Sequence, residues 1–223
     1  RGLKDRRLYG LKGFILKNKI TNYYDIANKS LEELKDTDIK ILDKVINEYN
    51  LKTYYFKNKD ILPRVKAVFG FLKAINPSSL LDVGSGRGVF LFPFLCEFDF
   101  CNVTSIDILE KRVELLNNIS LGGVKNLEAV FADISEYKSD KLYDCVTLLE
   151  VLEHIPNVKE AIKNAICLSK QYIVVTVPSK IDNNPEHIHF LTKDILTKYF
   201  NECGVTNLKF SGVNGHLVLI ARK

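Results

Sequence analysis

The sequence predicts an α/β fold, in which a doubly wound sheet of seven mostly parallel strands ends in an antiparallel last strand and follows an N-terminal helical cap. Three observations support this fold class. From residue 77 onward, short apolar runs alternate with stretches of helical periodicity. A glycine-rich turn follows the first apolar run, and the chain finishes with two apolar runs joined by a tight turn. Alternation of this kind is typical of parallel strands covered by helices on both faces.

The N-terminal region carries helical signals. Residues 1–20 mix basic and apolar residues, which fits either a frayed arm or a basic amphipathic helix. Ser30 followed by Glu33 is a capping box and predicts a helix that begins at Ser30. Thr37 or Asp38 can cap a second helix.

A third helix is expected after Asp60, with Pro63 in its first turn, where a missing N–H is tolerated. We therefore predict two regions. Residues 1–60 form a basic, mostly helical cap or extension, and residues 61–223 form the main domain.

The main domain contains a regular series of expected strands. Five apolar runs are predicted as parallel strands: Leu80–Val83, Val103–Ile106, Leu127–Phe131, Cys145–Leu149 and Tyr172–Val177. A helix over Lys193–Cys203 should end at Gly204. Asn207–Phe210 and Leu217–Ala221 then predict a final antiparallel hairpin.

Composition is that of an ordinary globular protein, with 46% hydrophobic and 26% charged residues in 223. No apolar run approaches the roughly 20 residues that span a bilayer, and no secretory signal is evident. The five cysteines are widely spaced and include no Cys-x-x-Cys pair, which favours reduced thiols over a disulfide framework or a zinc site. We therefore expect no membrane span and a cytoplasmic location.

Charge is unevenly distributed along the chain. Residues 1–76 hold 17 Lys and Arg against 9 Asp and Glu, whereas residues 77–223 hold 15 against 18. A basic excess of this kind can mark a surface for RNA or another anionic partner, or it can be a solvated, lysine-rich helical surface. The second interpretation is favoured.

The glycine-rich turn indicates a ligand site. Gly84, Gly86 and Gly88 follow an apolar strand directly and let ligand atoms approach backbone N–H groups. Asp107 ends the next expected strand, where a carboxylate can accept hydrogen bonds from ribose hydroxyls. Asp133 follows the third strand, where its side chain or the neighbouring backbone could meet an adenine edge. All lie at the carboxyl ends of parallel strands, where open α/β sheets bind ligands.

These segments resemble the class I methyltransferases that use S-adenosylmethionine. Leu80–Gly88 resembles their first motif, Asp107 their ribose-binding acid, Asp133 their adenine-contacting acid, and 144–156 their fourth motif. The resemblance covers about residues 77–223. It implies a Rossmann-like fold, S-adenosyl-L-methionine as cofactor, and these cofactor-binding residues: Asp82, Gly84, Ser85, Gly86, Gly88, Asp107, Ile108, Asp133, Ile134 and Glu150.

An acidic-histidine block supplies the candidate catalytic residues, which are Glu153, His154 and His187. If residues 150–154 start a helix, Glu150 shares a face with Glu153 or His154, and the groups could converge on a metal ion or a substrate hydroxyl. Similar sets occur in small-RNA 3′-terminal 2′-O-methyltransferases and in quinone-pathway O-methyltransferases. The favoured structural alternative has Glu150 lining the cofactor pocket, Glu153 capping or solvating a helix, and His154 packing below the sheet. We assign no metal ligand.

The resemblance implies methyl transfer by in-line displacement to a small-molecule acceptor, in a pocket roofed by residues 1–76. One alternative is an RNA methyltransferase that uses the basic N-terminal region and a metal ion to methylate a 2′ oxygen. Another is a non-catalytic nucleotide-binding module. The intact glycine turn and Asp107 argue against the last, because such a module would be free to lose them.

Overall fold

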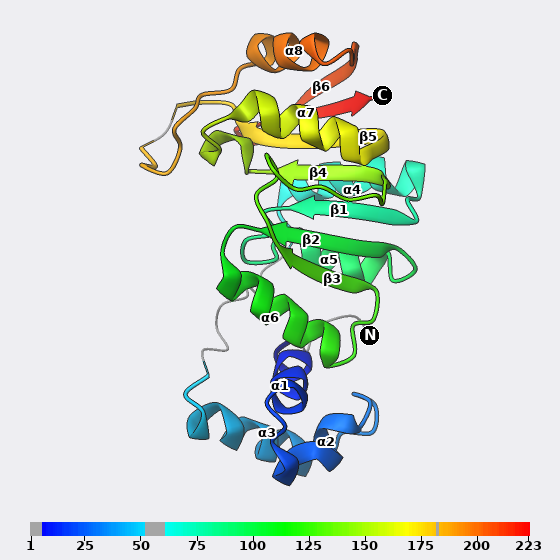
Figure 1. Cartoon of the computed structure of the whole chain (residues 1–223), viewed down its shortest axis with the longest axis vertical. Helices are drawn as coiled ribbons and strands as arrows, with labels where there is room; N and C mark the ends of the chain where they lie inside the picture. The colour runs from blue at the N-terminus through cyan, green and yellow to red at the C-terminus, as the bar shows by residue number, and fades with distance from the viewer. Residues whose placement is uncertain (1–5, 52–60, 182) are drawn as a thin grey trace.

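A computed structural model describes residues 6–51, 61–181 and 183–223. Seven strands form one sheet in the order β3-β2-β1-β4-β5-β7-β6, and β7 runs antiparallel to both of its neighbours (Figure 1). The strands are β1 (Ser79–Val83), β2 (Asn102–Asp107), β3 (Leu127–Phe131), β4 (Tyr143–Leu149), β5 (Ser169–Pro178), β6 (Asn207–Val213) and β7 (His216–Arg222). The predicted fold class and the antiparallel finish are confirmed.

Helices cover both faces of the sheet. They are α1 (Arg6–Lys17), α2 (Tyr24–Asn28), α3 (Asp36–Glu48), α4 (Pro63–Ile75), α5 (Leu91–Glu97), α6 (Glu110–Leu121), α7 (Val158–Leu168) and α8 (Lys193–Glu202), with short 3₁₀ turns at Thr21–Tyr23 and Leu152–His154. Among the described residues, no helix is long and apolar enough to cross a membrane.

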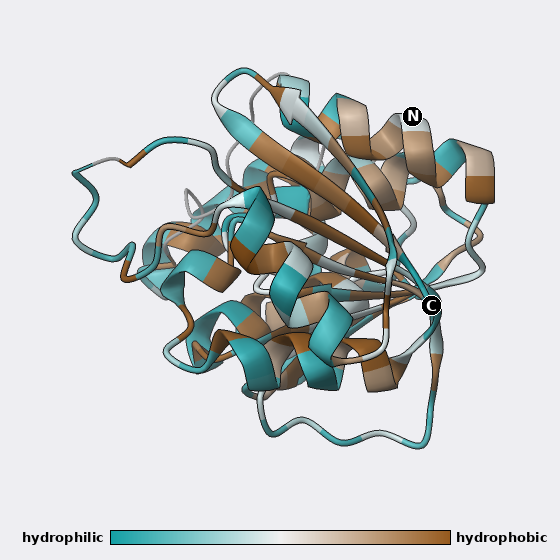
Figure 2. Ribbon diagram, turned by 90° about the horizontal axis from the view of Figure 1, so that it is seen from above, coloured by the Kyte–Doolittle hydropathy of each residue, from teal (hydrophilic) through white to brown (hydrophobic). Residues whose placement is uncertain are grey.

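The alternation of side chains along β1 shows how the two layers arise. Leu80 is buried with apolar residues of α4, α5 and α6, whereas Leu81 is buried with those of α7 and α8. Successive residues of a strand point to opposite faces, so a run that is apolar at every position needs cover on both sides. Viewed from above, the mostly brown strands lie between helices on both sides (Figure 2).

The N-terminal helices pack away from the strand ends. Helices α1, α2 and α3 share an apolar cluster that includes Leu11, Ile15 and Leu42, and α1 lies along α6. In Figure 1 these three helices lie beyond α6, at the β3 end of the molecule. These three helices therefore do not roof the carboxyl ends of β1 and β4, whereas Arg64 of α4 lies 3.9 Å from Glu150, directly after β4. A roof that other parts of residues 1–76 supply stays a prediction. The predicted boundary at residue 60 adjoins residues 52–60, which lie outside the described residues.

The first predicted helix start is also wrong. The Ser30 backbone N–H donates to Glu33 Oε2 at 2.7 Å, as a capping box requires, but only a turn follows. The helix begins at Asp36, because Asp38 accepts the Lys35 backbone N–H at 3.0 Å and also bonds Lys29 Nζ at 2.9 Å. The stronger cap thus sets the start of α3. The start of α4 at Pro63 is as predicted.

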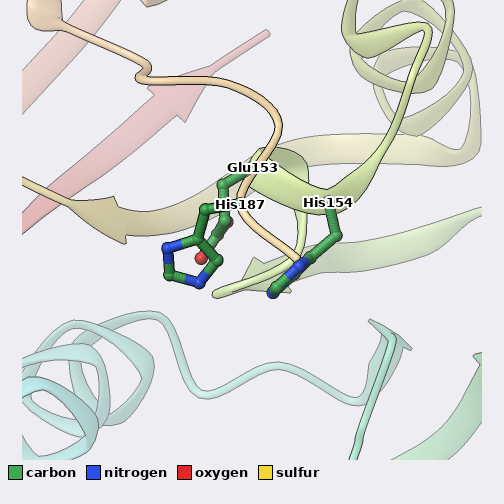
Figure 3. Close-up of side chains that lie close together, drawn as sticks. All are labelled: Glu153, His154 and His187. Atoms are coloured by element: carbon green, nitrogen blue, oxygen red, sulfur yellow. The ribbon is translucent and has the colours of Figure 1, made fainter. Parts of the chain in front are cut away.

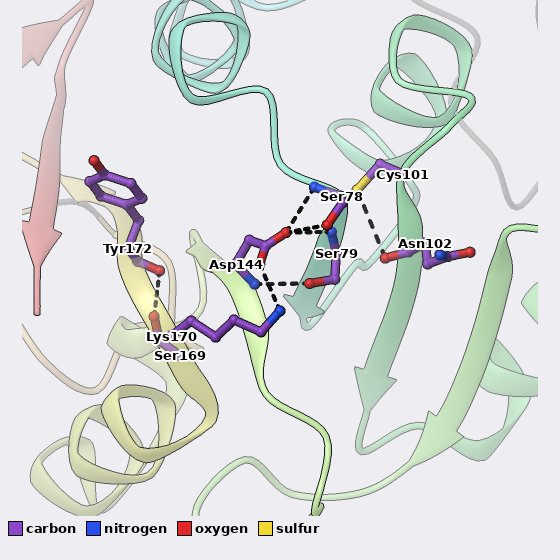
Figure 4. Close-up of polar contacts among 8 residues, drawn as sticks. All are labelled: Ser78, Ser79, Cys101, Asn102, Asp144, Ser169, Lys170 and Tyr172. Atoms are coloured by element: carbon purple, nitrogen blue, oxygen red, sulfur yellow. Dashed lines mark hydrogen bonds and ion pairs between the residues drawn. The ribbon is translucent and has the colours of Figure 1, made fainter.

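One carboxylate joins three strands at the amino edge of the sheet (Figure 4). Asp144 of β4 accepts hydrogen bonds from the backbone N–H of Ser78 at 2.9 Å, that of Ser79 at 3.0 Å, and the Ser78 hydroxyl at 2.6 Å. Lys170 of β5 contacts the other carboxylate oxygen at 2.8 Å. Burial alone would raise the pKa of Asp144, but the bonds from Lys170 and Ser78 hold it well below its usual range.

Candidate active site

The glycine turn connects β1 to α5 at the carboxyl edge of the sheet. Gly84, Gly86 and Gly88 all have positive φ, at 65°, 56° and 69°. A Cβ on Gly88 would lie 2.0 Å from the Phe92 ring, and one on Gly84 would lie 2.8 Å from Val151 Cγ2. A Cβ on Gly86 would meet nothing closer than 3.8 Å. The outer two glycines are therefore required by packing, whereas Gly86 leaves its backbone open.

A polar network supports this turn from below. The Ser85 hydroxyl donates to Asp82 Oδ2 at 2.5 Å and lies 2.6 Å from the Ser105 hydroxyl. The Thr147 hydroxyl donates to Asp82 Oδ1 at 2.7 Å. Burial raises the pKa of Asp82 to about 6, against the opposing effect of these hydrogen bonds and with a further rise from the charge of Asp107. Asp82 and Ser85 thus hold the shape of the turn, and their contact with a cofactor stays a prediction.

Asp107 ends β2 beside the turn. Ile106 pairs with Val83, and its carbonyl accepts the Gly84 N–H at 2.8 Å, so Asp107 follows at the level of the first glycine. Asp107 Oδ1 accepts the Leu109 N–H at 2.9 Å, and Oδ2 lies 3.3 Å from Arg112 Nη1. The carboxylate is therefore held in place next to the glycine turn. Arg112 was not singled out from the sequence.

The next three predicted residues, which follow β2 and β3, differ in how much of each side chain is exposed. Ile108 is 63% exposed and presents an apolar surface next to Asp107. Asp133 is exposed, and its Oδ1 accepts the Ser135 N–H at 2.7 Å. Ile134 is 3% exposed in the core, so only its backbone could meet a ligand.

An open pocket of about 460 Å³ adjoins Gly86 and Ile108. Its walls include Arg87, Arg112 and Phe131, the last of which is 60% exposed. Space, apolar surface and cationic groups therefore occur together on one side of the glycine turn.

Glu150 lies directly after β4 with a φ of 59°, which is unusual for a residue with a side chain. Its N–H donates to the Thr176 carbonyl at 2.8 Å. Its Oε2 lies 2.9 Å from His216 Nδ1, and its Oε1 lies 3.9 Å from Arg64 Nε. Arg64 and His216 were both missed, because they come from α4 and β7 and no local spacing links them to Glu150.

Residues 150–154 do not start an α-helix. Such a helix was the condition for Glu150 to share a face with Glu153 or His154. Leu152–His154 is a single 3₁₀ turn, and α7 begins only at Val158, with Asn157 as its cap. Pro156 explains the break, because a proline disfavours helical backbone at the residue before it. Glu150 therefore does not share a helix face with Glu153 or His154.

The three candidate catalytic residues are nevertheless brought together (Figure 3). Ligand atoms of Glu153, His154 and His187 lie within 4.8 Å of one another. Glu153 is 1% exposed, and the two imidazole rings meet edge to face with centroids 4.8 Å apart. His154 Nδ1 lies 2.8 Å from the Glu186 carbonyl oxygen. Glu153 thus neither caps nor solvates a helix, and His154 lies beside His187 after the end of β4.

Comparison with known proteins defines the family. A family model described as a methyltransferase domain matches residues 56–209, which is more than half of the chain. The chain belongs to this methyltransferase family. Its fold is accordingly that of the class I, S-adenosylmethionine-dependent methyltransferases.

Two named relatives each match less than half of this chain. Ubiquinone biosynthesis O-methyltransferase of Rickettsia felis is 36% identical over 92 residues, which are 41% of this chain and 37% of the relative. A probable (S)-tetrahydroprotoberberine N-methyltransferase of Papaver bracteatum is 30% identical over 86 residues, 38% of this chain and 24% of the relative. The matches thus span well under half of the length of these relatives.

A solved structure is similar over nearly the whole methyltransferase domain. The magnesium protoporphyrin IX methyltransferase of Synechocystis PCC 6803, with bound SAH, matches with a TM-score of 0.59 at 15% identity. The match covers 94% of this chain and 96% of that one. At this identity the similarity concerns the fold.

Proposed function

We propose that the protein is an S-adenosylmethionine-dependent methyltransferase that acts on a hydroxyl group of a small molecule. The observation that carries this proposal is the open backbone at Gly86, where a Cβ would meet nothing within 3.8 Å, next to the fixed carboxylate of Asp107. A bare turn beside a carboxylate matches the polar and hydroxylated parts of an adenosyl ligand.

Described side chains near both ends of such a cofactor support the proposal. Asp107 would accept hydrogen bonds from the ribose hydroxyls, and the exposed Ile108 would pack against the adenine. The Arg64 side chain is only 25% exposed. Among the described residues, its guanidinium makes a single ion-pair contact, at 3.9 Å from Glu150. It would bind the methionine carboxylate, a pairing for which arginine is well suited. When bound, the cofactor supplies a methyl group on a sulfonium.

Titration calorimetry with S-adenosylhomocysteine tests this assignment. Wild-type protein should bind, and Asp107→Ala should weaken binding at least about tenfold, since charge-assisted hydrogen bonds to the ribose contribute about 1.5–3 kcal/mol. Asp99→Ala is a matched control, because Asp99 is exposed and lies before β2 rather than after it. Absence of binding to wild type, or equal binding by both variants, would contradict the assignment.

The choice of a small hydroxylated acceptor is supported by the relatives and by the site. The O-methyltransferase relative and the N-methyltransferase relative are both named for small molecules. Glu153, His154 and His187 offer proton-accepting groups near the strand ends, as a hydroxyl nucleophile requires. The basic N-terminal charges are partly neutralised by ion pairs, such as Arg7 with Asp43 and Lys17 with Glu114, which weakens the case for RNA.

A second candidate is metal-assisted transfer, including 2′-O-methylation of RNA. One carboxylate and two imidazoles within 4.8 Å form a donor set that suits a divalent transition metal. Such an ion would lower the pKa of a bound hydroxyl. Calorimetry with Mn²⁺ or Zn²⁺ tests this. Binding that is lost in His187→Gln but retained in His189→Gln would favour the second candidate, and a salt-sensitive affinity for RNA would extend it.

We also propose a cytoplasmic location. All five cysteines are free thiols, and two of them, Cys101 and Cys145, are buried with raised pKa values. Free thiols in this number suit a reducing compartment. Fractionation of the source cells would check this.

A further inference from the structure

A carboxylate and an imidazole meet at the carboxyl edge of the sheet, apart from the Glu153, His154 and His187 cluster. His216 begins β7, and its partner in the sheet is Pro178, the last residue of β5. Glu150 follows β4, which neighbours β5. Glu150 and His216 are far apart in the sequence, so only folding brings them together.

The carboxylate of Glu150 and the imidazole of His216 are in direct contact. His216 Nδ1 lies 2.9 Å from Glu150 Oε2, without the alignment of a hydrogen bond. The carboxylate therefore holds the imidazole ring in place. Arg64 on α4 is the other charged group in contact with Glu150, at 3.9 Å. Among the described residues, the pair is therefore flanked by one fixed cation.

The pair lies close to the proposed cofactor turn. Glu150 directly precedes Val151, whose side chain would lie 2.8 Å from a Cβ on Gly84. The positive φ of Glu150 turns the chain sharply at this point, so that its side chain extends toward His216 while Val151 packs against the glycine turn. The His216 side chain is 24% exposed, which leaves part of the ring accessible to a second molecule.

We propose that His216, supported by Glu150, accepts the proton from the acceptor hydroxyl during methyl transfer. This rests on the proposed function. As the oxygen lone pair forms the new O–CH₃ bond, the C–S bond breaks and its electron pair goes to sulfur, which becomes a neutral thioether. The hydroxyl proton passes to the His216 ring, giving an imidazolium that faces the Glu150 carboxylate, and then leaves to solvent. A base paired with an orienting or stabilising carboxylate is a recurring arrangement for activating a hydroxyl.

The test uses 4-nitrocatechol as a chromogenic acceptor, because its phenolate absorbs at longer wavelength than its phenol. The probe is added to the complex with S-adenosylhomocysteine, at a pH where the free probe is protonated. The wild-type complex should show the phenolate band. His216→Gln and His216→Asn should reduce the bound phenolate fraction at least about tenfold, while Glu150→Gln reduces it less. His189→Gln, in the β5–α8 segment, should leave the band unchanged.

The outcomes separate this proposal from the function on which it rests. Calorimetry shows first that each variant binds S-adenosylhomocysteine and is therefore folded. A wild-type complex without a phenolate band overturns the role of His216 but leaves the methyltransferase assignment in place. A band that persists in both His216 variants also overturns it, and loss of that band with EDTA would instead assign proton removal to a metal at Glu153, His154 and His187. Failure of the wild type to bind S-adenosylhomocysteine overturns both proposals.

Discussion

Gly13 of α1 lies directly against the backbone carbonyl of Asn118 of α6, so that a Cβ on Gly13 would lie 1.7 Å from the Asn118 oxygen. On the other side of this contact, a Cβ on Gly122 would lie 1.8 Å from the Tyr9 carbonyl oxygen. Two helices can approach this closely only where side chains are missing. The N-terminal helices are therefore fixed to the main domain through glycine-mediated backbone contact.

Gly13→Ala should destabilise the protein by about 3 kcal/mol or more, because the added methyl group meets backbone that cannot move aside. Gly10→Ala is the matched control in the same helix. Its Cβ would lie 3.7 Å from Ile119, an ordinary contact, and alanine favours a helix by up to about 1 kcal/mol over glycine. Urea unfolding of the two variants checks this. Equal effects of both substitutions would mean that α1 and α6 are not in the close contact described.

The space around the glycine turn predicts different losses of stability for two alanine substitutions. Gly88→Ala should unfold at clearly lower temperature, since its Cβ would lie 2.0 Å from the Phe92 ring, in addition to the strain at a φ of 69°. Gly86→Ala has only the strain of its φ of 56°, about 1–2 kcal/mol, because the space around it is open.

We expect Gly86→Ala nevertheless to weaken S-adenosylhomocysteine binding at least about tenfold, because its methyl group would occupy space proposed for the ligand. Thermal unfolding and calorimetry on both variants separate stability from binding. A stable Gly86→Ala that binds with wild-type affinity would place the cofactor elsewhere.

The fold was largely predictable from sequence because its signals are local. Each parallel strand is an apolar run bounded by polar residues, and the β6–β7 turn carries Asn214 and Gly215, both with the positive φ that a two-residue hairpin favours. Where two local signals competed, sequence reasoning failed. Ser30 and Glu33 form their capping contact, but the cap three residues before Asp38 starts the helix.

The site was predictable only in part, for the same reason. Asp107, Gly86 and the Glu153 with His154 pair lie within recognisable motifs, and His187 was found by its residue type. Arg64 and His216 could not be found, because their significance depends on Glu150, which is 86 residues from the first and 66 from the second along the chain. Their meeting requires the sheet order that places β7 beside β5.

The Asp144 contact predicts a large difference between two substitutions at one site. Asp144→Ala should cost about 2–3 kcal/mol, because the backbone N–H groups of Ser78 and Ser79 lose a charged acceptor. Lys170→Ala should cost less than about 1 kcal/mol, since the lysine side chain is 50% exposed. Urea unfolding at neutral pH measures both.

The stability that the Asp144 contact provides should decrease in acid. The pKa of Asp144 is lowered in the folded protein, so its stabilising effect is present above the unfolded pKa near 4 and is lost as pH falls toward the folded value. The free-energy difference between wild type and Asp144→Ala should therefore shrink as pH falls from about 4. A difference that stays constant with pH would contradict the role given to the carboxylate.

Asp82 should show the opposite pH dependence. Its pKa is raised by burial from 3.8 to about 6, so the folded protein holds a proton that the unfolded chain releases between these values. Stability therefore falls as pH rises from about 4 to 6, by at most about 3 kcal/mol for a shift of this size. Asp82→Asn removes the titrating group but keeps an acceptor for the Thr147 hydroxyl. Relative to wild type, this variant should gain stability as pH rises through the window and then stay level. Urea unfolding across pH 4–8 checks this, with Asp99→Asn as an exposed control. Parallel stability curves for Asp82→Asn and wild type would show that the carboxylate beneath the glycine turn is charged throughout, and that the hydrogen bonds from Ser85 and Thr147 outweigh its burial.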